Sequence, residues 1–207
     1  MKHNRVPAPS KTLVIATANP GKLREIRSLL ADLPFDVICQ SALAVAPAEE
    51  TGSSFLSNSL LKARHAAAAT GAAAIADDSG LEVDALGGAP GIRSARYAGA
   101  VADDAANNAK LVAALAGLPM EKRRARYRCC VVFVDGPHDP KPLTAEGVWE
   151  GYILDAPRGS GGFGYDPYFW LPALDRTAAE LAPEEKNKRS HRGMALRSLR
   201  EQLAARI

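Results

Sequence analysis

Cysteine is scarce in this chain: only three occur among 207 residues, and no two of them form a C-x-x-C pair. So small and odd a number does not make the paired framework of a disulfide-rich secreted protein. The four histidines also lack the spacing of a zinc site. These absences indicate a reducing compartment, and we expect the protein to be cytoplasmic.

Long apolar runs are absent as well. No segment approaches the ~20 apolar residues that are needed to cross a bilayer, and residues 1–10 contain no apolar stretch typical of a signal peptide. We therefore expect no association with a membrane. We expect residues 1–11 to form a flexible N-terminal tail and residues 12–207 to form a single domain.

Neither sign of charge dominates the sequence. Lys and Arg number 26 and Asp and Glu number 23, which leaves a net charge of +3. This small excess falls short of the basic patch of a nucleic-acid-binding protein, but it suits an anionic small molecule. With 47% hydrophobic and 24% charged residues, the composition is that of a globular protein. We expect no nucleic-acid partner.

Apolar residues are spaced for alternating strands and helices in the first half of the chain. Residues 12–17 and 35–39 are predicted strands, and a helix with one apolar face lies between them. A second helix is predicted from Phe55 to about Thr70, where Gly71 provides the C-terminal stop.

The second half of the chain has more strand character. A helix begins at Asp103 or Asp104, either of which is a good N-terminal cap. Residues 125–135 and 143–153 are then predicted to form two long strands. Two helical stretches close the chain, one of them after Thr177.

Two adjacent carboxylates, Asp77 and Asp78, follow an apolar segment and directly precede Ser79 and Gly80. We expect the strand to end here in a Ser-Gly turn. Like charges at contact distance raise each other's pKa, and Mg²⁺ would relieve that conflict because it prefers carboxylate oxygens. An ordinary turn after a strand has the same composition. This segment alone therefore leaves a catalytic and a structural interpretation open.

Glu49 and Glu50 lie in a polar segment before the second helix. As isolated acids they would be solvated surface residues. If this segment folds toward Asp77 and Asp78, one of the two acids would complete a Mg²⁺ site together with substrate phosphates. Both interpretations stay open at this point.

Residues 17–22, with the sequence Thr-Ala-Asn-Pro-Gly-Lys, connect the first strand to the first helix. Unpaired backbone N–H groups and the helix dipole attract anions at such a position. Lys22 adds a cation, and Thr17 and Asn19 add short polar side chains. The segment predicts a phosphate cradle, although the Walker A spacing is absent and an ordinary turn is the alternative.

Residues 159–169 form a glycine-rich segment that contains a G-x-G-x-x-G pattern. The pattern does not open a helix, and Pro167 follows almost directly, which excludes a Rossmann dinucleotide site. A loop that lets the backbone approach a ligand fits better, with the ring of Phe163 or Tyr165 stacked on a base. The alternative is a loop anchored by its aromatic residues without any ligand.

His191 and Arg192 stand at the expected start of the last helix. Cations at a helix N-terminus oppose the helix dipole and need a compensating partner. An anionic or carbonyl-rich ligand would be such a partner, whereas a charged solvated helix face is the ordinary interpretation.

Four sequence blocks, at residues 76–81, 88–97, 162–167 and 190–193, resemble in content and order the inosine triphosphate pyrophosphatase family, also called the Ham1 family. That family removes non-canonical purine nucleotides from the nucleotide pool. The resemblance extends from about Leu13 to the C-terminus. It implies an α/β fold with a long twisted mixed sheet, two lobes with a nucleotide cleft between them, and a homodimer.

The resemblance also implies roles for individual residues. Asp78 would be the general base and a Mg²⁺ ligand, with Glu50 as a further metal ligand. The substrate-binding residues would be Thr17, Ala18, Asn19, Pro20, Gly21 and Lys22 at the triphosphate, Ser79 beside them, and Phe163, Gly164, Tyr165, Asp166, Lys186, His191 and Arg192 around the base and sugar.

The expected reaction is Mg²⁺-dependent hydrolysis of dITP, ITP or XTP to the nucleoside monophosphate and pyrophosphate. His191 and Arg192 would select 6-oxo purines, because both can donate hydrogen bonds to the oxygen at position 6. Two alternatives remain: a Maf-type nucleotide pyrophosphatase that prefers other bases, and a nucleotide-binding protein without turnover. Analysis of the products formed from dITP with Mg²⁺ separates them.

Overall fold

The computed structural model describes residues 11–101 and 103–206. The strands are β1 (Lys11–Ile15), β2 (Phe35–Cys39), β3 (Ala73–Val83), β4 (Arg124–Val134), β5 (Leu143–Ile153), β6 (Phe169–Leu171) and β7 (Arg176–Thr177). The helices are α1 (Pro20–Leu30), α2 (Phe55–Thr70), α3 (Asp104–Ala114), α4 (Pro183–Arg189) and α5 (His191–Arg206). The predicted tail, residues 1–11, lies outside the described residues except for Lys11, which begins β1. None of the helices described combines the length and the apolar character needed to cross a bilayer.

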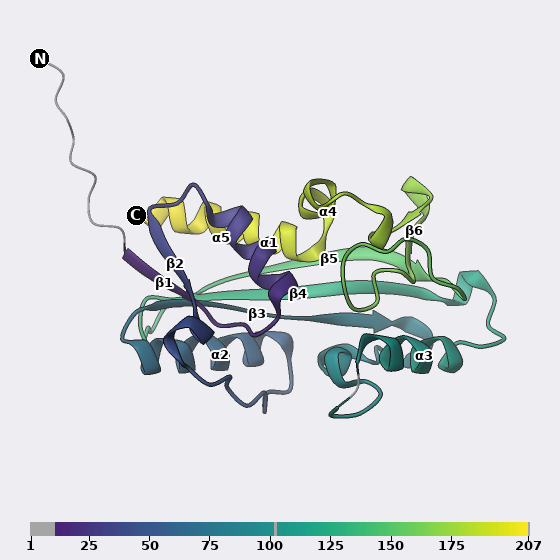
Figure 1. Cartoon of the computed structure of the whole chain (residues 1–207), viewed down its shortest axis with the longest axis horizontal. Coiled ribbons are helices and arrows are strands. Elements are labelled where there is room, and N and C mark those ends of the chain that lie inside the picture. The colour runs from purple at the N-terminus through teal and green to yellow at the C-terminus, as the bar shows by residue number, and fades with distance from the viewer. Residues whose placement is uncertain (1–10, 102, 207) are drawn as a thin grey trace, which may run out of the picture.

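The strands form one seven-stranded sheet in the order β2-β1-β3-β4-β5-β6-β7. β1 is parallel to β2 and to β3, and the remaining neighbours are antiparallel. In Figure 1 the long strands β3, β4 and β5 run along the molecule, with α2 and α3 on one side and α1, α4 and α5 on the other. The predicted α/β fold with a mixed sheet is confirmed, and its division into two lobes stays a prediction.

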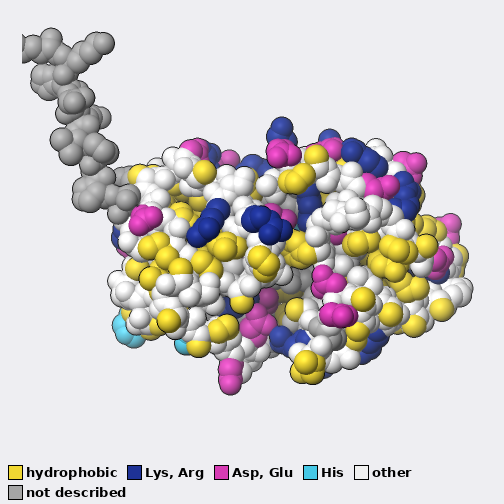
Figure 2. Space-filling view, viewed as in Figure 1, with side chains coloured by type: hydrophobic (Ala, Val, Ile, Leu, Met, Phe, Trp, Pro, Cys, Tyr) yellow, Lys and Arg dark blue, Asp and Glu magenta, His cyan; other side chains and the backbone are white. Residues whose placement is uncertain are grey.

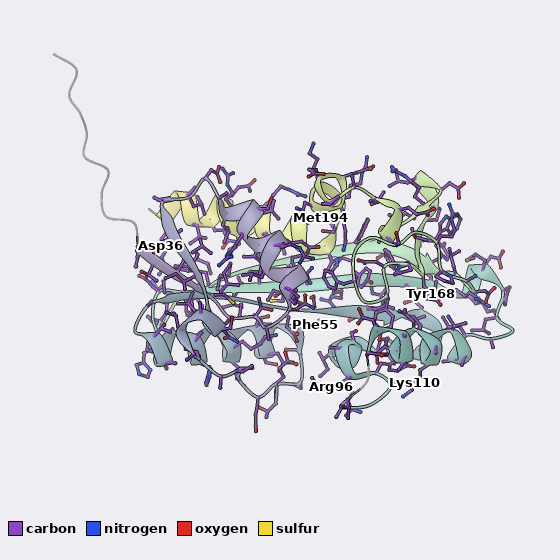
Figure 3. The ribbon with its side chains drawn as sticks, in the orientation of Figure 1. Asp36, Phe55, Arg96, Lys110, Tyr168 and Met194 are labelled. Carbon is purple, nitrogen blue, oxygen red and sulfur yellow. The ribbon has the colours of Figure 1, made fainter. Side chains whose placement is uncertain are left out.

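Alternating side chains along β3 divide the core into two layers. Ala74 and Ala76 belong to an apolar cluster with residues of α2, whereas Ala73 and Ile75 belong to a cluster with residues of α1 and α5. Figure 3 labels Phe55 of α2 on one side of the long strands. Successive residues of a strand point to opposite faces of the sheet. Two neighbouring polar residues of β3 therefore face different helices.

The turn predicted at Ser79 and Gly80 is wrong, because β3 continues through both residues. Gly80 lies against a short 3₁₀ helix, η3 (Gly91–Arg96). A Cβ atom on Gly80 would overlap the first carbonyl oxygen of η3 and would lie 2.5 Å from Ser94 Oγ. Glycine is needed here because another segment approaches the strand closely, and not because the chain turns.

Capping side chains fix the helix starts where the sequence predicts them. Asn19 caps α1, and Asp103 caps α3. Ser54 and Ser57 exchange hydrogen bonds in a capping box at the start of α2, which ends at Gly71 with φ of 68°. The segments before α1 and α2 are thereby held in place at their helix ends, and both carry predicted site residues.

We expect Gly80→Ala to lower the free energy of unfolding by about 1–3 kcal/mol, since the added methyl group forces η3 away from β3. Gly136→Ala is the matched control, because no atom lies within 4 Å of a Cβ atom built there, and it should change stability by less than ~0.5 kcal/mol. Urea unfolding of the three proteins measures both values. Equal stabilities of the two variants would contradict the close approach.

Candidate active site

The site lies where β1 ends beside β3. β1 pairs with β3 only from Leu13 to Ile15, and among the described residues no strand pairs with that edge of β3 at residues 77–80. In open α/β sheets, ligands bind at the carboxyl ends of the strands. Figure 2 shows acidic and basic side chains around a hollow in the middle of the molecule.

Two adjoining cavities open at this edge and share Asn19, Lys22 and Glu50 in their walls. The first, of about 140 Å³, contains Asp78, Ser79 and every residue predicted to bind the base and sugar, namely Phe163, Gly164, Tyr165, Asp166, Lys186, His191 and Arg192. The second, of about 580 Å³, is lined among others by Thr17, Ala18, Lys62 and Arg96. Three cations line each cavity, and aromatic side chains line only the first.

Asp77 faces α1 and α5 and is almost fully buried. Its Oδ2 atom accepts a hydrogen bond from Arg192 Nε at 3.0 Å and lies 3.0 Å from Lys22 Nζ. Burial opposes ionisation, but Lys22 and Arg192 outweigh it and hold the pKa of Asp77 far below its usual range. Asp77 is therefore a permanent anion that ties the first turn of α1 to the first turn of α5.

The guanidinium of Arg192 is bound by three protein acceptors. Besides the bond from Nε to Asp77, Nη2 donates to Ser79 Oγ at 2.7 Å and Nη1 pairs with Glu25 of α1. These contacts fix the orientation of the guanidinium in the wall of the first cavity. Selection of 6-oxo purines by Arg192 and His191 stays a prediction.

A buried ion pair anchors the glycine-rich loop. Lys186 Nζ of α4 lies 2.6 Å from Asp166 Oδ2, and the same oxygen accepts a hydrogen bond from Phe163 N at 2.9 Å. The Lys186 ammonium also lies 4.7 Å from the centre of the Phe163 ring. The ring packs on Gly21, where a Cβ atom would be 2.6 Å from it. Stacking of Phe163 on a base stays a prediction.

His191 begins α5 and stacks on Tyr127 of β4, with 4.6 Å between ring centres and 9° between ring planes. Gly147 of β5 makes this possible, because a Cβ atom there would overlap the His191 carbonyl oxygen. Burial, together with Arg192 and Lys186, lowers the pKa of His191 well below its usual value. The imidazole is therefore neutral at pH 7, and its Nδ1 atom has no hydrogen-bond partner among the described residues.

Asp78, the next residue along β3, faces α2 instead. Its Oδ2 atom accepts a hydrogen bond from Asn58 Nδ2 at 3.0 Å, and its Oδ1 atom lies 3.3 Å from Lys62 Nζ, which in turn lies 2.8 Å from Glu50 Oε1. Burial raises the pKa of Asp78 although Lys62 opposes it. Burial also acts on Glu50, but Lys62 and Arg96 outweigh it and lower the pKa of Glu50. A raised pKa suits a carboxylate that accepts a proton from water.

The neighbouring carboxylates thus do not form the like-charged pair expected from the sequence. Because β3 is extended here, Asp77 and Asp78 point to opposite faces and each has its own cations. Among residues 11–101 and 103–206, no three His, Cys, Asp or Glu side chains are grouped to hold a metal ion. The carboxylates that do approach each other, across Lys62, are Asp78 and Glu50.

The start of α1 differs from the predicted phosphate cradle. Asn19 Oδ1 accepts hydrogen bonds from the backbone N–H groups of Gly21 and Lys22 at 2.8 and 3.1 Å, and Pro20 has no N–H group. The helix cap therefore uses the donors that were expected to bind an anion. Pro20 and Gly21 also line neither cavity. Phosphate binding by residues 17–22 stays a prediction.

Helix α3 holds the glycine-rich loop from the other side. Asp104 Oδ2 accepts a hydrogen bond from Gly164 N at 2.7 Å, and Asn108 Nδ2 donates to Gly164 O at 2.9 Å. The two side chains stand four residues apart on one face of the helix, so the N–H and the C=O group of one residue, Gly164, are both held. This contact fixes the loop wall of the first cavity.

Residues 13–202 match the model of one protein family, described as the Ham1 family. The chain belongs to the Ham1 family. Relatives called dITP/XTP pyrophosphatase from Yersinia pseudotuberculosis and Xanthomonas campestris are 56% and 54% identical to it, over 92% and 94% of this chain and 97% and 98% of theirs. This confirms the resemblance predicted from the four sequence blocks.

Solved structures of Ham1 proteins have the same fold. A HAM1 protein from Coxiella burnetii superposes with a TM-score of 0.87 at 48% identity, covering 94% of this chain and 99% of that one. The Ham1 protein of Staphylococcus aureus gives 0.84 at 42% identity, covering 95% and 100%.

Several residues of this Ham1-family site were missed by the sequence analysis. Asn58 and Lys62 stand four residues apart on one face of α2. This spacing of two polar residues among mostly apolar ones could have indicated that they belong to the site. Glu25, Arg96 and Asp104 meet partners that are far away in the sequence. Nothing in their local sequence distinguishes them from surface charges.

We expect Asp77→Asn to lower the free energy of unfolding by about 3–5 kcal/mol at pH 7, because Lys22 and Arg192 lose their buried counter-ion. Because the pKa of Asp77 is low in the folded protein, its contribution to the free energy of unfolding is complete above the unfolded-state pKa of ~3.9. The contribution decreases as the pH falls from there toward the folded-state pKa. Urea unfolding from about pH 8 to 3 should therefore show the difference shrinking below about pH 4. The exposed substitution Asp36→Asn is the control. A difference that stays constant over this range would contradict the assignment.

Proposed function

We propose that this chain hydrolyses non-canonical purine nucleoside triphosphates, with dITP, ITP and XTP as candidates, to the monophosphate and pyrophosphate. The relatives called dITP/XTP pyrophosphatase, which match it over most of both chains, support this substrate class. The observation that carries the proposal is the pair of adjoining cavities with the Asp78 carboxylate in the first of them. One cavity suits a base and sugar, and the other suits a chain of phosphates.

The phosphate cavity has the charge that this substrate requires. Lys22, Lys62 and Arg96 all line it, and lysine ammonium groups bind phosphate as point charges. Lys22 stands at the border of both cavities, where the α- and β-phosphates of a bound nucleotide would lie. Its ammonium would neutralise the departing pyrophosphate.

Glu50 and Asp78 fit a magnesium ion by their chemistry. Mg²⁺ takes one or two carboxylates and completes its shell with waters and substrate phosphates. A cation, the ammonium of Lys62, already lies between these two side chains, at 2.8 and 3.3 Å. When bound, the metal would supply positive charge and acidify the attacking water.

Asp78 is the residue that would accept the proton of the water attacking the α-phosphorus. Asn58 donates to Oδ2 of Asp78 and is itself completely buried, so the carboxylate cannot rotate freely. The Oδ1 atom, which faces Lys62, would be the oxygen that accepts the proton. The expectations of a homodimer and of a cytoplasmic location remain predictions.

Chromatography of a dITP digest tests the reaction. We expect dIMP and pyrophosphate in equal amounts, because attack of water at the α-phosphorus releases one of each per turnover. A preparation of Asp78→Asn, purified identically, controls for contaminating phosphatases. Formation of dIDP and free phosphate would overturn the proposal.

Asp78→Asn should lower kcat for dITP at least ~10²-fold, because the amide keeps the shape of the side chain but cannot accept a proton. Circular dichroism should show an unchanged fold, since the amide can still accept the hydrogen bond from Asn58. The exposed variant Asp36→Asn should retain the full rate. Near-normal turnover of Asp78→Asn at saturating Mg²⁺ would move the general base to another residue.

A further inference from the structure

The ammonium of Lys62 lies between the two carboxylates that suit a divalent cation. Its Nζ atom is 2.8 Å from Glu50 Oε1 and 3.3 Å from Asp78 Oδ1. The Lys62 side chain is only 13% exposed, and that of Asp78 only 7%. The Glu50 side chain is 26% exposed, so the triad is largely enclosed and reaches solvent at Glu50.

Every oxygen of the two carboxylates has a donor in this arrangement. Glu50 Oε2 pairs with Arg96 Nη1 at 2.9 Å, and Asp78 Oδ2 accepts the hydrogen bond from Asn58 at 3.0 Å. Figure 3 shows Arg96 on the α2 side of the long strands. Lys62 alone contacts both carboxylates, so movement of that one side chain exposes one oxygen on each of them.

We propose that Lys62 is a resident counter-ion that occupies the place of the divalent cation and must leave before Glu50 and Asp78 can bind a metal. This inference rests on the proposed metal-dependent reaction and adds a positioning residue to it. Without Lys62, two carboxylates would face each other in a partly buried place, where like charges repel strongly. The ammonium removes that repulsion, and a divalent cation competes with it for the same oxygens.

The Lys62 ammonium, once displaced, can move into the phosphate cavity. Lys62 lines the phosphate cavity together with Lys22 and Arg96, and its flexible four-carbon stem allows the charge to move without the helix moving. A triphosphate in that cavity would offer the ammonium new anionic partners. Metal binding and nucleotide binding would therefore support each other, because each stabilises the position of Lys62 that the other requires.

Binding of Mn²⁺, measured without nucleotide by electron paramagnetic resonance, tests this exchange. Lys62→Met keeps the length of the stem and removes the charge. We expect its Kd for Mn²⁺ to fall about tenfold below that of the wild type, since the metal no longer displaces a charge-assisted contact. Lys110→Met on α3, whose ammonium donates to the Tyr97 carbonyl and lies over the Tyr97 ring, should leave the Kd unchanged. An unchanged or weaker Mn²⁺ affinity in Lys62→Met would overturn the proposal.

Arg96→Met is a second comparison, because it removes the other cation from Glu50 but none from Asp78. It should strengthen Mn²⁺ binding less than Lys62→Met does. An equal gain would mean that general charge removal, and not the shared position of Lys62, controls the metal site. Circular dichroism of each variant shows whether it is folded before binding is measured.

Acetylation of the wild-type chain gives a test that does not depend on any variant. Lysine labelling followed by mass spectrometry should show Lys62 reacting faster at saturating Mn²⁺, while the labelling of Lys110 stays constant. An unchanged rate at Lys62 would contradict displacement. Neither Mn²⁺ binding nor lysine labelling involves turnover. If the dITP digest gave other products, the proposed reaction would be rejected, and these two measurements would still test the role of Lys62.

Discussion

The buried carboxylate of Asp77 holds the centre of this structure together. It meets Lys22 from the first turn of α1 and Arg192 from the first turn of α5, each at 3.0 Å. These helices are far apart in the sequence and would otherwise bring two cations into one buried place. A buried cation without a partner is strongly unfavourable. Both helices therefore depend on Asp77, although Arg192 also pairs with Glu25. The walls of the first cavity follow from that arrangement, because Lys22 and Arg192 form part of them.

Because β3 is extended, Asp77, which stabilises the fold, and Asp78, which is proposed to act in the reaction, lie on opposite faces of the sheet. Asp77 points to the α1 and α5 side, where its Oδ2 atom meets two cations, whereas Asp78 points to the α2 side. There the partners are Asn58 and the exchangeable ammonium of Lys62. Side-chain alternation thus places one permanent anion and one reactive carboxylate at adjacent positions. Both remain close to the cavities, because β1 ends before it reaches this part of β3.

Local patterns in the sequence predicted most of the elements correctly. The start of α3 was predicted from its capping residue, and the long strands β4 and β5 from their composition, whereas the caps of α1 and α2 appear only in the structure. The turn predicted at Gly80 was wrong because glycine occurs both in turns and where another segment approaches closely. Only the approach of η3 shows that the second reason applies here. The cap at Asn19 was also not foreseen, since its side chain accepts hydrogen bonds from the N–H groups of Gly21 and Lys22, and phosphate binding by this segment stays a prediction.

The sequence by itself determined the family, the alternation of elements and about half of the residues that line the two cavities, because motifs and caps act over a few neighbouring positions. Only the tertiary structure decided which charge meets which. The ion pairs of Asp77 with Arg192 and of Lys186 with Glu25 join residues from opposite parts of the chain. Electrostatic energy depends on distance and burial, and neither is fixed until the helices have packed on the sheet. The same holds for Lys62, whose position between Glu50 and Asp78 exists only after α2 has docked against β3.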